Sequence, residues 1–165
     1  EFGARSTGEP ASLRGVVCDA AGLIDGLVFP TARPRVMHAE RTFWEKATAL
    51  HAEAHRPAGS PTPLYFSRHF YDLAMLLETD DGQAAAADLG LLVQVARHKA
   101  TFFRSGWANY ETARPGTLQL MPDGARAKDL RADYRAMMPM MFDQTPLSFD
   151  DVLARIAALE KTINS

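Results

Sequence analysis

Residues 40–51 read ERTFWEKATALH, and this stretch decides how the rest of the chain is interpreted. Its apolar residues recur at i, i+4, i+7 and i+11, which is the spacing of one helix face. These residues are Phe43, Ala47, Leu50 and Ala54. The run RPAG at residues 56–59 ends the pattern. The sequence therefore predicts a helix over residues 39–55.

Four more helices are predicted downstream of this stretch. The second carries the apolar stripe Phe66, Phe70, Leu73 and Leu77, and residues 79–82 are interpreted as the break after it. The third is expected over residues 83–103, with an inward face of Leu89, Leu92, Val93, Ala96 and Ala100. The fourth covers residues 125–141, after a short strand at 118–121. The fifth begins at Ser148, which has the character of an N-cap.

Residues 1–37 differ in character, because they are rich in Gly, Pro, Val and Arg and show weak helical periodicity. Two or three short strands are predicted there, at residues 2–6, 16–18 and 29–37. Pro30 and Pro34 restrict the last one to an edge strand or a loop. The expected fold is therefore α+β and predominantly helical, with short strands in residues 1–37 and a helical domain over residues 38–165.

Composition excludes several classes of protein. The chain has 165 residues, of which 47% are hydrophobic and 23% charged, so disorder over its whole length is not expected. No apolar run approaches the about 20 residues that span a bilayer. The net charge of -2 argues against nonspecific wrapping of nucleic acid, although not against a local basic groove. The lone cysteine, Cys18, favours a reducing cytoplasm.

Common catalytic motifs are missing from the sequence. There is no Gly-x-Ser-x-Gly elbow and no phosphate-binding P-loop. His51 and His55 share a helix face, but Ala52 stands where a zinc protease needs Glu. A histidine-metal hydrolase is therefore a weak hypothesis. The simpler interpretation is that His51 and His55 lie at the polar margins of a core helix.

Two charged residues at helix edges are the main catalytic candidates. Lys46 lies beside the apolar stripe, where it either extends its stem along the surface or directs a point charge at phosphate oxygens. Asp72 lies off the stripe of its own helix on a face with His69, and Arg68 one turn earlier is a candidate ion-pair partner. A solvated helix charge is the alternative for Asp72.

Basic and aromatic residues alternate over residues 97–114. The basic ones are Arg97, Lys99, Arg104 and Arg114, and the aromatic ones are Phe102, Phe103, Trp107 and Tyr110. Such a segment suits single-stranded nucleic acid, because bases stack on the rings while phosphates pair with the cations. A packed loop with its aromatic rings turned inward is the alternative.

Several stretches resemble the AbiEii/AbiGii toxin family of nucleotidyltransferases. EFGARSTGEP at residues 1–10 resembles one of its segments, and ERTFWEKATALH resembles a motif centred on a lysine. SRHFYDL at residues 67–73 resembles a motif centred on an aspartate. FFRSGW at 102–107 and ARPG at 113–116 resemble the C-terminal part of one branch, the MenT-like toxins.

The resemblance implies a fold related to DNA polymerase β, and transfer of a nucleotide from a nucleoside triphosphate to RNA such as a tRNA 3′ end. It also implies a cognate antitoxin, a role in phage defence, and Mg²⁺. Lys46 and Asp72 would be catalytic. Substrate would be bound by Arg41, Arg68, Arg104, Trp107 and Arg114.

The chain departs from the family pattern in its acidic residues. The family's metal-binding Asp-x-Asp after Gly-Ser is not found, and His69 stands where many relatives carry Asp. We therefore expect the C-terminal part of a longer nucleotidyltransferase, with strands 1–37 at the edge of its core and no activity in isolation. The alternative is a non-catalytic helical module that binds an antitoxin or a partner subunit.

Overall fold

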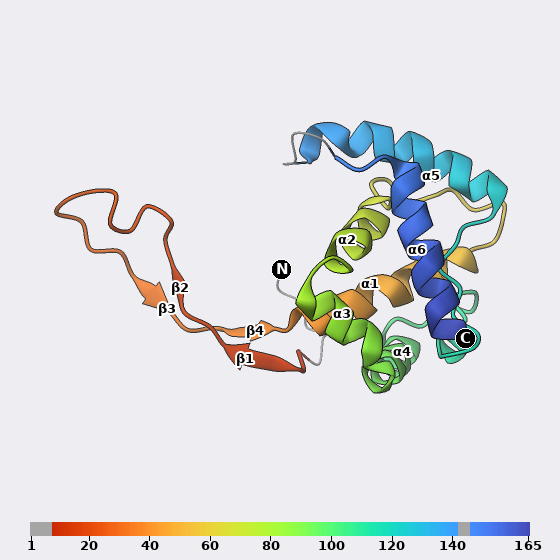
Figure 1. The fold of residues 1–165 in the computed structure, drawn as a ribbon, viewed down its shortest axis with the longest axis horizontal. Coiled ribbons are helices and arrows are strands. Elements are labelled where there is room, and N and C mark those ends of the chain that lie inside the picture. Colours follow the sequence, from red (N-terminus) through yellow and green to blue (C-terminus); the bar gives the residue numbers. More distant parts are fainter. Residues whose placement is uncertain (1–7, 142–145) are drawn as a thin grey trace.

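The computed structural model describes residues 8–141 and 146–165. Within these ranges, two short antiparallel strand pairs precede six α-helices (Figure 1). The predicted α+β, predominantly helical fold is confirmed. The strand predicted at residues 2–6 lies outside the described residues. None of the described helices is long and apolar enough to cross a membrane.

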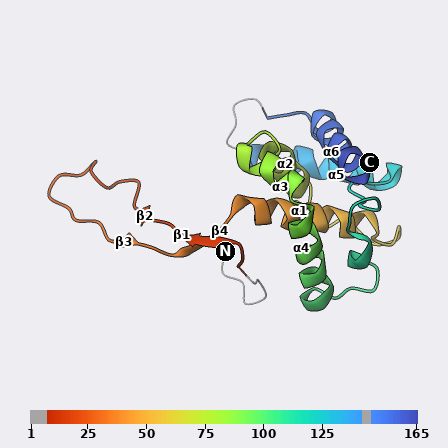
Figure 2. The ribbon, with the colours of Figure 1, turned by 60° about the horizontal axis from the view of Figure 1, so that its bottom comes forward.

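The strands form a narrow hairpin that we call the arm, residues 8–37. β1 (Ala11–Leu13) pairs with β4 (Arg35–Met37), and β2 (Val16–Val17) pairs with β3 (Thr31–Ala32). Both views show the arm extending away from the helices (Figures 1 and 2). The regions of β2, β3 and β4 were predicted, but β1 was not.

Most large apolar residues of the arm are exposed to solvent. Val28 is 99% exposed and Leu23 is 81% exposed, and Leu13, Val16 and Val17 are at least half exposed. The base of the arm is tied to the helices, because the His38 amide donates to the Pro10 carbonyl at 2.9 Å. The arm therefore adds little to the hydrophobic core.

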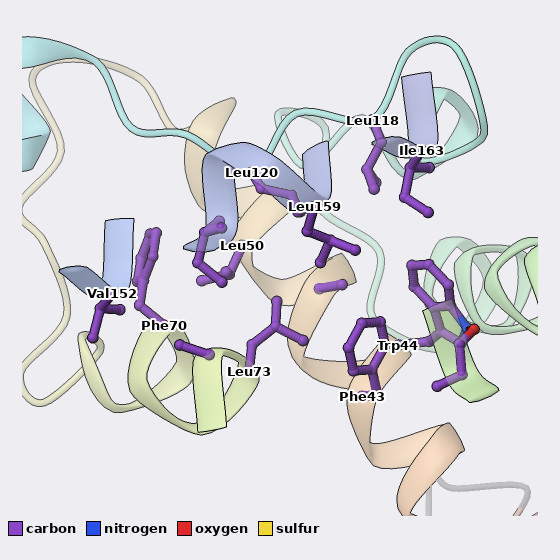
Figure 3. Packing of buried hydrophobic residues seen from close by; sticks show 14 of the residues in the cluster. Phe43, Trp44, Leu50, Phe70, Leu73, Leu118, Leu120, Val152, Leu159 and Ile163 are labelled. Atoms are coloured by element: carbon purple, nitrogen blue, oxygen red, sulfur yellow. The ribbon is translucent and has the colours of Figure 1, made fainter. Parts of the chain in front are cut away.

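The core is built around α1 (Ala39–Ala54), which contacts α2, α3 and α4. Phe43, Trp44 and Leu50 are fully buried, as the helical stripe predicts. Figure 3 shows them packed with Phe70 and Leu73 of α2 (Arg68–Leu76) and with residues of α6. The helix predicted over residues 39–55 is confirmed to within one residue.

The predicted third helix is wrong in its extent, because this region forms two helices. They are α3 (Asp80–Ala87) and α4 (Leu89–Phe102). The Thr79 hydroxyl accepts from the Gly82 amide, so the run interpreted as a break is the start of α3. Asp88 in turn caps α4 by accepting from the Leu91 amide at 2.9 Å.

The new boundary also changes which face of α4 is buried. Leu89 and Val93 are 37% and 49% exposed, although the sequence placed them inward. Leu91 and Val95 are buried instead, together with Leu92 and Ala96. The buried face of α4 is therefore shifted toward Leu91 and Val95 relative to the predicted one.

The last two helices agree more closely with prediction. α5 (Gly124–Met137) ends four residues early, because Pro139 lies in the following 3-10 turn Met138–Met140. α6 (Phe149–Asn164) begins after Ser148, whose hydroxyl accepts from the Asp151 amide at 3.1 Å. The predicted inward face of α6 is buried, at Val152, Ile156, Leu159 and Ile163.

The strand predicted at residues 118–121 is absent from the described strands. Leu118 and Leu120 are buried as they would be in a strand. Their backbone groups, however, bond to side chains of α6 instead of to a neighbouring strand. Asn164 of α6 both donates to the Leu118 carbonyl at 2.8 Å and accepts from its amide at 3.0 Å. The Glu160 carboxylate accepts from the Leu120 and Met121 amides. The backbone is therefore satisfied without a sheet.

Candidate functional site

Lys46 and Asp72 meet between α1 and α2. The Lys46 Nζ lies 2.7 Å from the Asp72 Oδ2. The two side chains remain 24% and 40% exposed, so the pair sits at the surface above the buried stripes of both helices. The two residues singled out from separate motifs thus lie side by side, within reach of a dissolved ligand.

His69 joins this pair through its ring. Its Nδ1 lies 3.2 Å from the Lys46 Nζ. Burial of the ring, and next the positive charges of Lys46 and Arg68, lower the pKa of His69 to about 4. The ring is therefore neutral at pH 7, and Nδ1 accepts from the ammonium while the proton sits on Nε2. Sequence reasoning did not select His69, although its spacing of three from Asp72 places both on one face.

Asp133 of α5 fixes the start of α2. Its carboxylate accepts from the Tyr65 amide at 2.5 Å, the Ser67 amide at 2.8 Å and the Ser67 hydroxyl at 2.6 Å. Ser67 is fully buried, and Tyr65 has a φ of 57°, in the left-handed region. These bonds determine where α2 begins and so where His69 and Asp72 point.

Arg41 and Arg68, two of the predicted substrate-binding arginines, lie on α1 and α2, the helices that carry Lys46 and Asp72. In the described part of the chain, Asp72 forms its ion pair with Lys46 rather than with Arg68. Arg68 is exposed and acts on His69 through its charge. Arg41 is only 3% exposed, and it donates to the Glu9 carbonyl at 2.6 Å and to Glu45 at 3.1 Å. Arg41 therefore holds the arm against α1.

Residues 97–102 of the basic and aromatic segment belong to α4, and residues 103–114 form a loop that includes a 3-10 turn, Tyr110–Thr112. Arg104 and Tyr110 line a pocket of about 320 Å³ together with Ala100, Ser105, Gly106 and Glu111. The Arg56 guanidinium lies 4.4 Å from the centre of the Trp107 ring. Arg114 is exposed. The loop thus presents cations and aromatic rings in part to solvent and in part to α1.

His51 fixes this loop rather than holding a metal. The Gln119 amide donates to His51 Nδ1 at 3.0 Å, so Nε2 carries the proton and donates to the Asn109 carbonyl at 3.0 Å. Burial, the largest cause, lowers the pKa of His51. With both nitrogens engaged, the ring has no lone pair left for a metal ion.

The described residues do not fit a Mg²⁺ site. Across residues 8–141 and 146–165, no three side chains among His, Cys, Asp and Glu group so that they can hold a metal. Asp72 is a single carboxylate that faces an ammonium, whereas Mg²⁺ requires several oxygen ligands.

Comparison with protein families gives the class of protein: a nucleotidyltransferase toxin of a toxin–antitoxin system. The matching family is described as nucleotidyl transferase AbiEii toxin, Type IV TA system, and the match covers residues 1–155. The chain belongs to this AbiEii family, which implies a nucleotide substrate and an antitoxin partner. Comparison with curated proteins gives no significant match, and comparison with solved structures gives none either.

Proposed function

We propose that this chain binds the nucleoside triphosphate and the RNA acceptor of a nucleotidyltransferase toxin, which transfers a nucleotide to RNA such as a tRNA 3′ end. The observation that carries the proposal is the contact of Lys46 with both Asp72 and His69, at 2.7 and 3.2 Å. It joins the two family-like motifs in one surface site. Lys46 and Asp72 are the catalytic candidates.

Lys46 supplies the positive charge for the phosphates. Asp72 pairs with the ammonium at 2.7 Å and so holds it at the partly exposed surface between α1 and α2. His69 is neutral at pH 7, so it orients Lys46 as an acceptor without adding a competing charge. Nucleotidyl transfer depends mainly on positioning and on stabilising phosphate charge, and a preorganised ammonium provides both. The Mg²⁺ expected for this chemistry would need ligands beyond the described residues.

The loop after α4 supports binding of the RNA. Arg104 and Tyr110 share a pocket that offers a cation and a ring to a nucleotide. Trp107 is partly exposed beside Arg56, and Arg114 is exposed nearby in sequence. Stacking of a base on an aromatic ring contributes about 1–3 kcal/mol. An unpaired RNA end suits this surface better than a duplex does, because its bases are free to stack.

The test uses the protein made from the complete reading frame that encodes this chain. It is incubated with labelled nucleoside triphosphates, Mg²⁺ and total tRNA, beside its Lys46→Ala and Lys128→Ala variants. We expect labelled tRNA with the unaltered protein and with the variant at Lys128, an exposed residue of α5, but not with Lys46→Ala. We expect no transfer by the isolated 165-residue chain. Absence of labelled RNA from the complete protein would refute the proposal.

The exposed arm favours a second candidate, a binding module without catalysis. Leu13, Val16, Val17 and Val28 present apolar side chains that are at least half exposed in the described part of the chain. In this case the cognate antitoxin would bind the arm. Co-purification of the two proteins, lost in a Val16→Ser/Val28→Ser variant while tRNA labelling is absent throughout, would favour this candidate over the first.

A further inference from the structure

A half-buried strip runs along α1 between α2 and α4. It consists of Thr42, Glu45, Lys46 and Ala49, which recur at helical spacing and are all partly exposed. On one side, α2 places His69 and Asp72 against Lys46. On the other side, α4 places Lys99 against Glu45. Charged groups from three helices therefore line one strip of surface.

Lys99 of α4 contacts this strip through an ion pair with Glu45. Its Nζ lies 2.7 Å from the Glu45 Oε2, and its side chain is 13% exposed. The ammonium also lies 4.9 Å from the centre of the Phe103 ring. The ammonium is thus held between the Glu45 carboxylate and the Phe103 ring, and the side chain keeps a small exposed fraction.

Glu45 has a second cationic partner. Its other oxygen, Oε1, accepts from the buried Arg41 at 3.1 Å. One carboxylate is therefore shared by two cations and cannot neutralise both. If Lys99 turned toward a ligand, Glu45 would still be paired with Arg41, so no buried carboxylate would be left without a partner.

The charge around the strip is positive. Among the described residues, the cations Arg41, Lys46 and Lys99 pair with the carboxylates Glu45 and Asp72, and the charge of Arg68 acts on the neighbouring His69. Lys99 is also close enough to His69 for its charge to help lower the pKa of the ring, after burial and the larger effects of Lys46 and Arg68. The cations of α1 and α4 thus act on the same region of space.

We propose that Lys99 is a second phosphate-binding residue, and that the polyphosphate of the nucleotide lies along the α1 strip between Lys46 and Lys99. Lys46 contacts it from the side of α2, and Lys99 from the side of α4. Glu45 holds Lys99 in place before the nucleotide binds. This inference rests on the proposed function, since it names a further contact for the same nucleotide.

The experiment measures binding of ATP and of inorganic tripolyphosphate to the 165-residue chain by calorimetry, without Mg²⁺. The variants are Lys99→Met, Lys99→Arg and Lys46→Met, with Lys128→Met as the control at an exposed lysine. Lys99→Met removes the charge and keeps an unbranched side chain of similar length, so we expect the fold to be preserved. Lys99→Gln is a second neutral variant if Lys99→Met fails to fold, and circular dichroism checks each protein.

We expect Lys99→Met to weaken binding of both ligands about tenfold, because one charge-assisted contact is lost. Lys99→Arg should retain most of the affinity, and Lys128→Met all of it. Because the contact is to phosphate, the loss should be the same for ATP and for tripolyphosphate. A loss seen with ATP alone would place Lys99 at the base or ribose and overturn the proposal.

The two proposals fail in different ways. If Lys46→Met weakens binding while Lys99→Met and Lys99→Gln do not, then Lys99 is not a phosphate ligand and the proposed function stands. If the unaltered chain binds neither ATP nor tripolyphosphate, both proposals are wrong. Equal weakening by Lys128→Met would show that only overall charge matters, and would also overturn the role of Lys99.

Discussion

The Nδ1 of His69 on α2 lies 3.2 Å from the Nζ of Lys46 on α1, so a neutral imidazole accepts from a charged ammonium. Protonation of the ring would replace this attraction with repulsion between two cations in a partly buried site. Burial and these neighbouring charges together keep the pKa of His69 near 4. The contact therefore links the geometry of the candidate site to pH.

The first prediction is that His69 makes folding less stable in acid. Its pKa is about 6.5 in the unfolded chain and about 4 in the folded one, so the unfolded chain binds the proton first. The contribution of His69 to the free energy of unfolding is fully present above pH 6.5. It falls as the pH drops toward 4, by at most about 3 kcal/mol. Urea unfolding of the unaltered chain and of His69→Gln should show a shallower loss in the variant. Identical pH profiles would contradict the assignment, because His51, whose pKa is also lowered, is retained in both proteins.

The second prediction separates chemistry from packing in α1. Lys46→Ala in the complete protein should reduce transfer by about 10²–10³-fold, the usual effect of losing one preorganised charge. Its stability should change by no more than about 1 kcal/mol, since the side chain is partly exposed. Phe43→Ala should instead lose about 3–5 kcal/mol of stability, because Phe43 is fully buried. Thermal melts and transfer assays distinguish the two. A Lys46→Ala protein that melts early and keeps its specific activity would make Lys46 a packing residue.

The third prediction concerns the start of α2. Asp133→Ala removes the carboxylate that accepts from the buried Ser67 amide and hydroxyl, and leaves the hydroxyl with only its weak contact to Met137 Sδ at 4.0 Å. We expect a loss of about 1–3 kcal/mol in the free energy of unfolding. Affinity for ATP should also fall, since α2 carries His69 and Asp72. Asp129→Ala, at an exposed position one turn earlier on α5, is the matched control. An unchanged midpoint in urea would show that α2 does not depend on Asp133.

The fourth prediction concerns the segment at residues 118–121. Glu160→Ala leaves the Leu120 and Met121 amides without their acceptor, and should cost about 1–3 kcal/mol. Glu160→Gln should cost less, because an amide oxygen still accepts. Urea titration of the two variants and of Lys161→Ala, an exposed neighbour, tests this order. Equal stability for all three would mean that water replaces Glu160.

The fifth prediction tests the loop after α4. Arg104→Met should weaken tRNA binding, and it should reduce the slope of log K against log salt by about 0.7, the contribution of one phosphate contact to single-stranded RNA. Arg135→Met, at an exposed arginine of α5, should leave the slope unchanged. Binding is measured by fluorescence anisotropy across a salt series. A slope that changes equally in both variants would mean that Arg104 contributes only net charge.

Helical periodicity predicted the core faces of α1 and α6 well, because these stripes are buried, whereas Leu89 and Val93 of the predicted α4 stripe are exposed. Phe43 and Leu50 in α1, and Ile156 and Leu159 in α6, lie where their spacing placed them. The division between α3 and α4 was missed, since Thr79 and Asp88 act as caps only once the neighbouring amides are in place. Local composition cannot separate such a cap from a break.

The site was predictable only in part. Lys46 and Asp72 lie in family-like motifs, but their contact depends on how two helices pack, and the spacing within either helix does not determine that. His69 became a candidate only when its ring was found against Lys46. Asp133 lies 66 residues beyond Ser67 in the chain, so sequence periodicity contains no signal for that pairing.

The arm shares few contacts with the core, and its outer strands are only two residues long. In this chain, its amide protons should therefore exchange with solvent through local openings, while those of α1 exchange only on global unfolding. A protease that cuts near the tip, around residues 19–28, should leave the helical body folded. The two parts of this chain thus differ in local stability, and any surface that covers the arm would be detected as slower exchange in residues 8–37.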